Sequence, residues 1–300
     1  MNRKSLLLSI GFVLFWNSGF IGAEFGLKYS GSFSLMFWRY FALSFFLFAY
    51  LLLRKRLKAV RRSAIIVNML VGVLAHGVWL ACVLWALDYG VPAGIVALVV
   101  ALQPLATGAF SGMVTGEPTP LHRWLGLLVG FTGVGISVLS GIDFDNPESV
   151  FAYLVPIGSV IAITAATLIQ RKMEIKDAKA RLPIDLSLFY QSVATALVLA
   201  LPAIFVEHLQ AEWSKEFIGI MLWLVFAVSL LAYTLMWILI KRIDATRVAG
   251  LFYLGPPVTM LMAWATLGDT PGTYEIIGLI VVFAGVVLTQ WNFGKTKKSA

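Results

Sequence analysis

Few side chains in this sequence could do chemistry, and those few lie inside long apolar stretches. A polar group in such a setting is costly unless it is paired or used for function. His76 lies in the middle of an apolar run, with Trp79 one turn further along the same face of a helix. Gln103 directly precedes Pro104, and Asn17 lies within the first apolar run. We predict that these polar groups contact a bound small molecule; a purely structural role is the alternative for each.

Aromatic residues extend this candidate site. Tyr233 lies one turn before Trp237, and Tyr253 stands shortly before a double proline. Aromatic side chains in membrane helices often serve packing or form interfacial belts, so packing is the second interpretation here. The complete predicted substrate-binding set is Asn17, His76, Trp79, Gln103, Tyr233, Trp237 and Tyr253.

The sequence carries none of the patterns that would make these residues catalytic. The tail holds Gly294-Lys295-Thr296, but Thr289 stands where a phosphate-binding loop needs a glycine. Neither H-E-x-x-H nor G-x-S-x-G occurs, and the three histidines fall at different depths of the apolar runs. We therefore predict no catalytic residues, no bound metal, no cofactor and no enzymatic activity.

Charged residues bear on the substrate and its driving force. Glu24 and Asp88 fall at the outer ends of apolar runs, and Asp185 falls at an inner end. Proton-driven pumping usually needs a carboxylate deep in the membrane. Arg39 lies near the outer end of the second run, and apart from it no Lys or Arg lies in the core of a run. The sequence therefore predicts a neutral or zwitterionic substrate that moves with little or no ion coupling.

The elements that would position these residues are membrane-spanning helices. Of 300 residues, 60% are hydrophobic and 13% charged, and the mean hydropathy is +0.88. Soluble domains carry about 25% charged residues, whereas a spanning helix needs about 20 apolar residues. A cleaved signal peptide is the less favoured interpretation of the first run. Ten runs of spanning length occur, at about residues 5–24, 33–53, 64–87, 91–114, 122–140, 150–170, 186–206, 217–240, 246–267 and 273–292.

Loop charges give the orientation of these runs. If they alternate across the membrane, 20 of the 23 Lys and Arg residues fall on one side, and only Lys28 and Lys215 fall on the other. Basic residues accumulate on the cytoplasmic side, so we expect both termini there. The net charge of +8 is thus explained by the membrane, and no nucleic-acid partner is expected. A single cysteine, Cys82, permits no internal disulfide.

The chain contains an internal repeat. Residues 94–138 align without gaps on residues 246–290, a spacing of 152. We therefore divide the chain into a first five-helix repeat, 1–141, and a second, 142–300. Because five is odd, the second repeat is expected to lie inverted in the membrane, as in many secondary transporters.

Prolines recur at matching places in the two repeats. Pro104 aligns with Pro256, and a proline removes one helical hydrogen bond and clashes with the carbonyl four residues earlier. A packing kink is one interpretation. Because the kink is expected in both repeats, we predict hinge or gating roles for Pro104, Gly255, Pro256 and Pro257.

Three segments resemble the drug/metabolite transporter superfamily, and within it the ten-helix EamA type. They are FWNSGFIGAEFGLKY at 15–29, FWRYFALSF at 37–45 and G-E-P followed by W-x-G at 116–126. The second repeat departs from the pattern at Asp269-Thr270. The resemblance implies export or exchange of small metabolites by alternating access, with YddG-like amino-acid exporters as the favoured branch. It also implies that helices 1, 3, 4, 6, 8 and 9 enclose the path, supported by helices 5 and 10.

We thus expect an all-α polytopic membrane protein of ten transmembrane helices in the bacterial inner membrane. It would export or exchange small neutral or zwitterionic metabolites, chiefly amino acids, including aromatic ones. There are two alternatives. One is efflux of drugs or metabolites by proton antiport, and the other is a membrane protein that is not a transporter, namely a channel or receptor. The expected partners are a small-molecule substrate and the lipid bilayer, with the chain a monomer or weak homo-oligomer. Close packing, within the chain or between protomers, is expected from the glycines of helices 5 and 10, which are Gly126, Gly130, Gly133, Gly135, Gly278 and Gly285.

Overall fold

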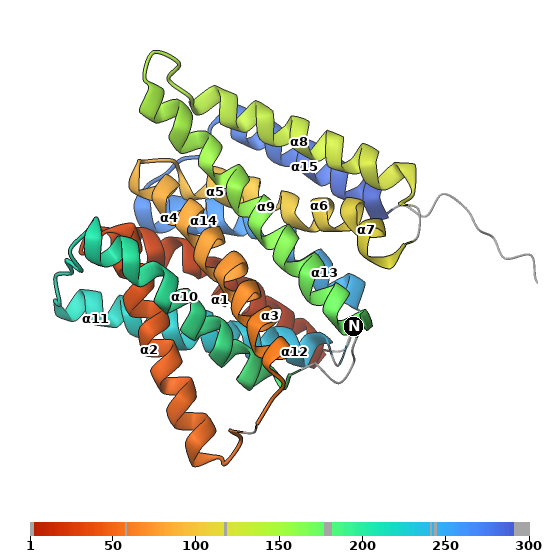
Figure 1. Ribbon diagram of the computed structural model, residues 1–300. Helices are drawn as coiled ribbons and strands as arrows, with labels where there is room; N and C mark the ends of the chain where they lie inside the picture. The colour runs from red at the N-terminus through yellow and green to blue at the C-terminus, as the bar shows by residue number, and fades with distance from the viewer. Residues whose placement is uncertain are drawn as a thin grey trace, which may run out of the picture.

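The computed structural model describes residues 3–57, 59–116, 119–176, 182–240, 242 and 245–290. In this part of the chain the backbone is helical, apart from connecting turns and one bridge between Ser30 and Ala211. The helices pack as a bundle (Figure 1). They are α1 (Arg3–Leu27), α2 (Ser32–Leu53), α3 (Arg62–Gly72), η1 (Val73–Val78), α4 (Trp79–Asp88), α5 (Ala93–Val100), α6 (Leu102–Phe110), α7 (Gly112–Thr115), α8 (Leu121–Gly141), α9 (Pro147–Lys176), α10 (Ile184–Phe205), α11 (Lys215–Leu222), η3 (Trp223–Ala232), α12 (Tyr233–Ile240), α13 (Ala245–Phe252), α14 (Gly255–Leu267) and α15 (Thr273–Gln290).

Long apolar helices dominate the bundle. Among the described residues, nine helical stretches are long and apolar enough to cross a membrane, and Thr273–Thr289 is a shorter apolar helix. Large apolar side chains face outward, with Phe45 68% and Phe205 74% exposed. Such a surface is unfavourable in water but suits lipid. Nine of the ten expected spans are thereby confirmed by length and composition.

Two helices are broken where a proline requires it. α5 ends at Val100 and α6 begins at Leu102; Pro104 has no N–H to donate to the carbonyl of Val100 and clashes with it. α13 ends at Phe252, which is four residues before Pro256, and α14 begins one residue before that proline. The kinks expected from the prolines are therefore present, and their role as hinges stays a prediction.

Two spanning stretches contain π-helical segments that the apolar pattern does not reveal. η1 connects α3 to α4 and contains His76, whereas η3 connects α11 to α12. A π-helical turn places an extra residue in the helix and changes the direction of the side chains that follow it, and such turns are frequent at functional sites. η1 contributes His76 to the cavity described below, and η3 contributes Val228 to a small hollow beside that cavity.

Glycines allow α8 and α15 to lie side by side (Figure 1). A Cβ atom on Gly133 would lie 2.6 Å from the carbonyl oxygen of Gly278, and one on Gly285 would lie 2.6 Å from that of Gly126. Any larger residue would force these backbones apart. The expected close packing is confirmed within the chain. Gly135 is not part of it, because a Cβ there would meet nothing within 4 Å.

A carboxylate joins the start of α2 to a segment far away in sequence. The backbone N–H groups of Phe33 and Ser34 donate to Glu207, at 3.0 and 2.7 Å. Exposed N–H groups at a helix N-terminus favour such a negative charge. The Ser32 hydroxyl also donates to Asp88, at 2.8 Å. These contacts fix the start of α2 against the loop after α10 and against the end of α4.

Candidate functional site

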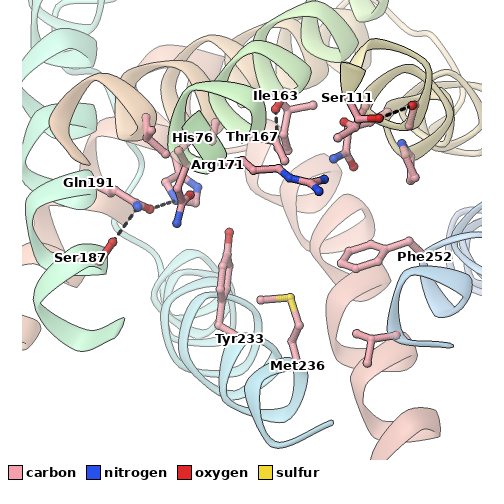
Figure 2. A pocket seen from close by; sticks show the side chains of 18 of the residues that line it. His76, Ser111, Ile163, Thr167, Arg171, Ser187, Gln191, Tyr233, Met236 and Phe252 are labelled. Carbon is pink, nitrogen blue, oxygen red and sulfur yellow. Dashed lines mark hydrogen bonds between the residues drawn. The ribbon is translucent and has the colours of Figure 1, made fainter. Parts of the chain in front are cut away.

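A cavity of about 970 Å³ lies inside the bundle, at the upper end of the range of about 300–1,000 Å³ that is usual for small-molecule sites. All six helices expected to enclose a path contribute to its lining. Figure 2 shows His76 and Gln191 opposite Ser111 and Phe252, with Tyr233 and Met236 reaching in from α12. Each of the six expected helices contributes at least one lining residue; in chain order, examples are Trp16, His76, Gln103, Thr167, Tyr233 and Phe252.

The structure brings most of the predicted binding residues together at this cavity. His76, Gln103, Tyr233 and Tyr253 line it. Trp79 instead lines an adjoining hollow of about 40 Å³. Their common use in binding a substrate stays a prediction.

Asn17 has a different position from the one expected. Its Nδ2 donates to the carbonyl of Val13 at 2.7 Å, and its Oδ1 accepts from the Thr259 hydroxyl at 3.3 Å. It also lies against Gly255, since a Cβ there would be 2.9 Å from Oδ1. It is not among the residues that line the cavity, so its visible contacts hold α1 to the start of α14. The side chain of Trp237, another predicted binding residue, lies outside the described part of the structure.

The predicted hinge residues differ in their position relative to the cavity. Pro104 lines the cavity, whereas Gly255, Pro256 and Pro257 are not among its lining residues. Gly255 and Pro256 are buried at the start of α14. Pro104 therefore has a position from which a change in helix direction would alter the cavity itself.

A chain of hydrogen bonds fixes His76, and its members were not predicted. His76 Nε2 lies 3.0 Å from Gln191 Oε1, and Gln191 Nε2 donates to the Ser187 hydroxyl at 3.0 Å (Figure 2). The Ser187 hydroxyl in turn donates to Asn68. Because Gln191 uses its amide nitrogen as a donor toward Ser187, its oxygen faces the histidine, and His76 Nε2 must carry the proton. The chain orients the imidazole from α10, a helix not expected to line the path.

Aromatic rings form one wall beside this histidine. Trp16 lies 5.2 Å from Tyr233 and 5.2 Å from Phe252 between ring centroids. His76 is 6.0 Å from Tyr233 and 5.5 Å from Tyr40. Such spacings are typical of tilted and edge-to-face contacts. The wall can pack against an apolar or aromatic group, while His76 and Gln103 offer neutral polar contacts.

The charges around the cavity are all positive among the described lining residues. Arg123 donates to Ser111 at 3.1 Å, and Arg171 is exposed at the cavity lining. No Asp or Glu of the described residues lines the cavity or the adjoining hollow. Over the same part of the chain, no group of three His, Cys, Asp or Glu could hold a metal ion.

Arg39 is more buried than its place in the apolar run suggested. It stands about two turns into α2, is only 7% exposed, and lines the adjoining hollow. Its distance from the edge of the apolar run gives its position along the helix but does not report burial against another helix. Arg39 is buried by its contact with η3, a helix far away in sequence.

Comparison with known proteins identifies relatives along nearly the whole chain. Residues 3–139 and 150–291 match the EamA-like transporter family. An uncharacterized transporter of Archaeoglobus fulgidus is 26% identical over 298 residues, covering 96% of this chain and 98% of the relative. A probable amino-acid metabolite efflux pump of Salmonella typhimurium is 22% identical over 306 residues, covering 98% and 97%.

One solved structure, described only as the crystal structure of a protein, shares the fold. It superposes with a TM-score of 0.61 at 20% sequence identity and covers 97% of both chains. This likeness supports the arrangement of the helices and carries no information about the ligand.

Proposed function

The chain belongs to the EamA-like transporter family and is a multi-pass transporter of the plasma membrane, and we propose that its substrates are small neutral or zwitterionic metabolites, chiefly amino acids. It exports or exchanges them by alternating access, with little or no ion coupling. The similar efflux pump of Salmonella typhimurium, named for amino-acid metabolites, is consistent with this class.

The lining of the cavity is the observation that carries this proposal. It joins an aromatic wall, Trp16 with Tyr233 and Phe252, to the neutral polar groups of His76 and Gln103. A site of this kind fits a molecule with one apolar and one polar end. The described lining residues include no carboxylate that could alternate between a proton and a substrate.

We also infer ten spans built as two inverted five-helix repeats, divided at 1–141 and 142–300. Local geometry recurs at the spacing of 152 found in the sequence. The helix breaks after Val100 and Phe252 are equivalent, and so are the left-handed helix-ending glycines Gly116 (φ 73°) and Gly268 (φ 82°). Moved by 152 positions, η1 falls within η3. On this reading α15 is the tenth span, and both termini lie in the cytoplasm.

The proposed mechanism follows from the broken helices. The cavity lining includes Arg123 and Arg171, which belong to the strongly basic side of the loop pattern, so this cavity would open to the cytoplasm. A change in bend at Pro104 and Pro256 would close that end and open the other. Rocking of one half against the other around a fixed site is the usual form of alternating access in inverted-repeat transporters.

Proton-coupled efflux is the second candidate, and Glu24 is the reason to keep it. Its Oε2 is buried and has no hydrogen-bond partner among the described residues. Glu24 is not among the residues lining the cavity, which favours the uncoupled carrier. Replacing Glu24 with Gln separates the two: an uncoupled carrier keeps its transport, whereas a proton antiporter loses its response to a pH gradient.

Uptake into proteoliposomes tests the proposed substrate class. Radiolabelled aromatic, small neutral, acidic and basic amino acids are offered to the purified protein without any ion gradient. We expect saturable uptake that neutral amino acids compete for and that His76→Ala lowers. If no amino acid is taken up by folded protein, the proposed substrate class is wrong.

A further inference from the structure

Arg39 is a buried cation with no anion beside it among the described residues. Its side chain is 7% exposed, about two turns from the start of a helix that crosses the membrane. Over the described residues, the one ion pair within 4.0 Å joins Arg56 to Asp185, and neither contacts Arg39. A charge in such a place is expensive unless it is paired or has a function.

The contacts of the guanidinium leave part of it unused. Nε and Nη2 both donate to one acceptor, the Ser229 hydroxyl, at 3.1 and 2.9 Å. That hydroxyl donates to the carbonyl of Leu224, five residues earlier, at 3.0 Å. Its lone pairs are thus directed at the arginine. The guanidinium carbon also lies 5.6 Å from the centre of the Tyr40 ring. No described residue accepts a hydrogen bond from Nη1.

Arg39 lines the adjoining hollow. This hollow is lined by Arg39 together with Trp16, Tyr40, His76, Trp79 and Tyr233. Three of these residues, Trp16, His76 and Tyr233, also line the main cavity, so the two spaces share a wall. The buried indole N–H of Trp79 has no acceptor among the described residues either. Two residues that line this small space, Arg39 and Trp79, thus each have a donor without an acceptor among the described residues.

The hollow is too small for a metabolite but large enough for one polar group. Its volume is about 40 Å³, whereas a single water needs at least about 10–15 Å³. A planar carboxylate matches the geometry of guanidinium donors, and its single negative charge equals the charge to be neutralised. A phosphate would bring a larger group and up to two charges.

We propose that Arg39 binds the carboxylate of the transported molecule in this hollow, while the rest of that molecule occupies the main cavity. The inference rests on the proposed function and narrows it: a free carboxylate becomes the required feature of the substrate. The aromatic wall then contacts the side chain of the substrate. Neutral metabolites without a carboxylate, which the broader proposal admits, are excluded as good substrates.

Pairs of ligands that differ only in the carboxylate test this without requiring transport. The thermal unfolding midpoint of the purified full-length protein in detergent is measured against concentration for L-phenylalanine and L-phenylalaninamide, L-leucine and L-leucinamide, and L-alanine and L-alaninamide. A hydrogen bond to a charged group is worth at least about tenfold in affinity. We therefore expect at least one acid to stabilise the wild type at a concentration at least about tenfold lower than its amide.

Variants assign that preference to the arginine. In Arg39→Gln the difference between acid and amide should fall to within about twofold. Arg54→Gln is the matched control, because Arg54 is an exposed residue at the end of the same helix, and it should keep the full preference. Ser229→Ala, which removes the visible acceptor but not the charge, should also keep it. If Arg39→Gln does not fold, Arg39→Lys and the wild-type acid–amide comparison still decide the question.

The outcomes separate this inference from the proposed function. The inference is overturned if none of the three acids stabilises the wild type better than its amide, or if Arg39→Gln keeps the preference. Saturable amino-acid uptake with an unchanged preference in Arg39→Gln would leave the proposed function standing and remove the role of Arg39. If an acid binds in an Arg39-dependent way but is not taken up, the role of Arg39 in binding is supported and the proposed amino-acid transport is contradicted.

Discussion

Restoring the missing backbone donors at the two helix breaks should slow transport without weakening binding. In Pro104→Ala, residue 104 regains an N–H that can donate to the carbonyl of Val100, where α5 now ends. In Pro256→Ala, the same bond can form to Phe252, the last residue of α13. Each change favours one continuous helix over a broken one and so opposes a change in bend.

The size of the effect follows from one hydrogen bond at each site. A backbone hydrogen bond contributes about 0.5–1.5 kcal/mol net. If this bond must break during each transport cycle, turnover falls about 2- to 12-fold, because about 1.36 kcal/mol corresponds to a factor of ten in rate. The breaks lie in different helices, so the double variant should lose about 5- to 150-fold if the two effects add.

Initial rates of amino-acid uptake into proteoliposomes, measured against substrate concentration, separate turnover from binding. We expect the maximal rate to fall as calculated and the half-saturating concentration to stay within about twofold. Pro156→Ala is the control, because α9 runs unbroken through Pro156, and it should change the rate less than about twofold. If Pro104→Ala and Pro256→Ala both transport at the wild-type rate, the hinge reasoning is wrong.

Three further changes test other parts of the structure. Gly133→Ala should destabilise the protein by about 1–3 kcal/mol, because its Cβ would lie 2.6 Å from a carbonyl oxygen of α15; Gly135→Ala, with nothing within 4 Å, should not, and equal unfolding midpoints would contradict this packing. Gln191→Leu leaves His76 Nε2 without its partner and should cost about 1–3 kcal/mol of stability, while a raised half-saturating concentration would show that the imidazole is oriented for binding. Glu207→Ala removes the acceptor at the start of α2 and should cost about 0.5–2 kcal/mol, visible as a lower unfolding midpoint; an unchanged midpoint would mean that water replaces the carboxylate at no cost.

The sequence predicted those features that depend on neighbouring residues. Apolar runs locate spanning helices because lipid leaves no other backbone structure. A proline acts on the carbonyl four residues before it, so Pro104 and Pro256 predict breaks whose positions the structure reproduces. Gly133 was expected to allow close packing, and it does so against α15.

Features made by contacts between helices could not be predicted. Gln191 is the one amide side chain in its apolar run, and that was the available signal. Its pairing with His76, 115 residues away in sequence, is a contact between two helices. Arg39 looked peripheral because distance from the end of an apolar run does not report burial against another helix. Asn17 looked like a binding residue, but its visible partners are Val13 and Thr259. The π segments change a helix by one residue, which apolar periodicity cannot resolve.

Counterflow tests the central claim most directly. Proteoliposomes are loaded with an excess of an unlabelled neutral amino acid and diluted into a trace of the labelled form. The pH is the same on both sides, and there is no membrane potential. An uncoupled alternating-access carrier predicts a transient accumulation of label above equilibrium that saturates with substrate. Non-saturating flux without accumulation would contradict the account and indicate a channel, and accumulation that requires a proton gradient would indicate antiport instead.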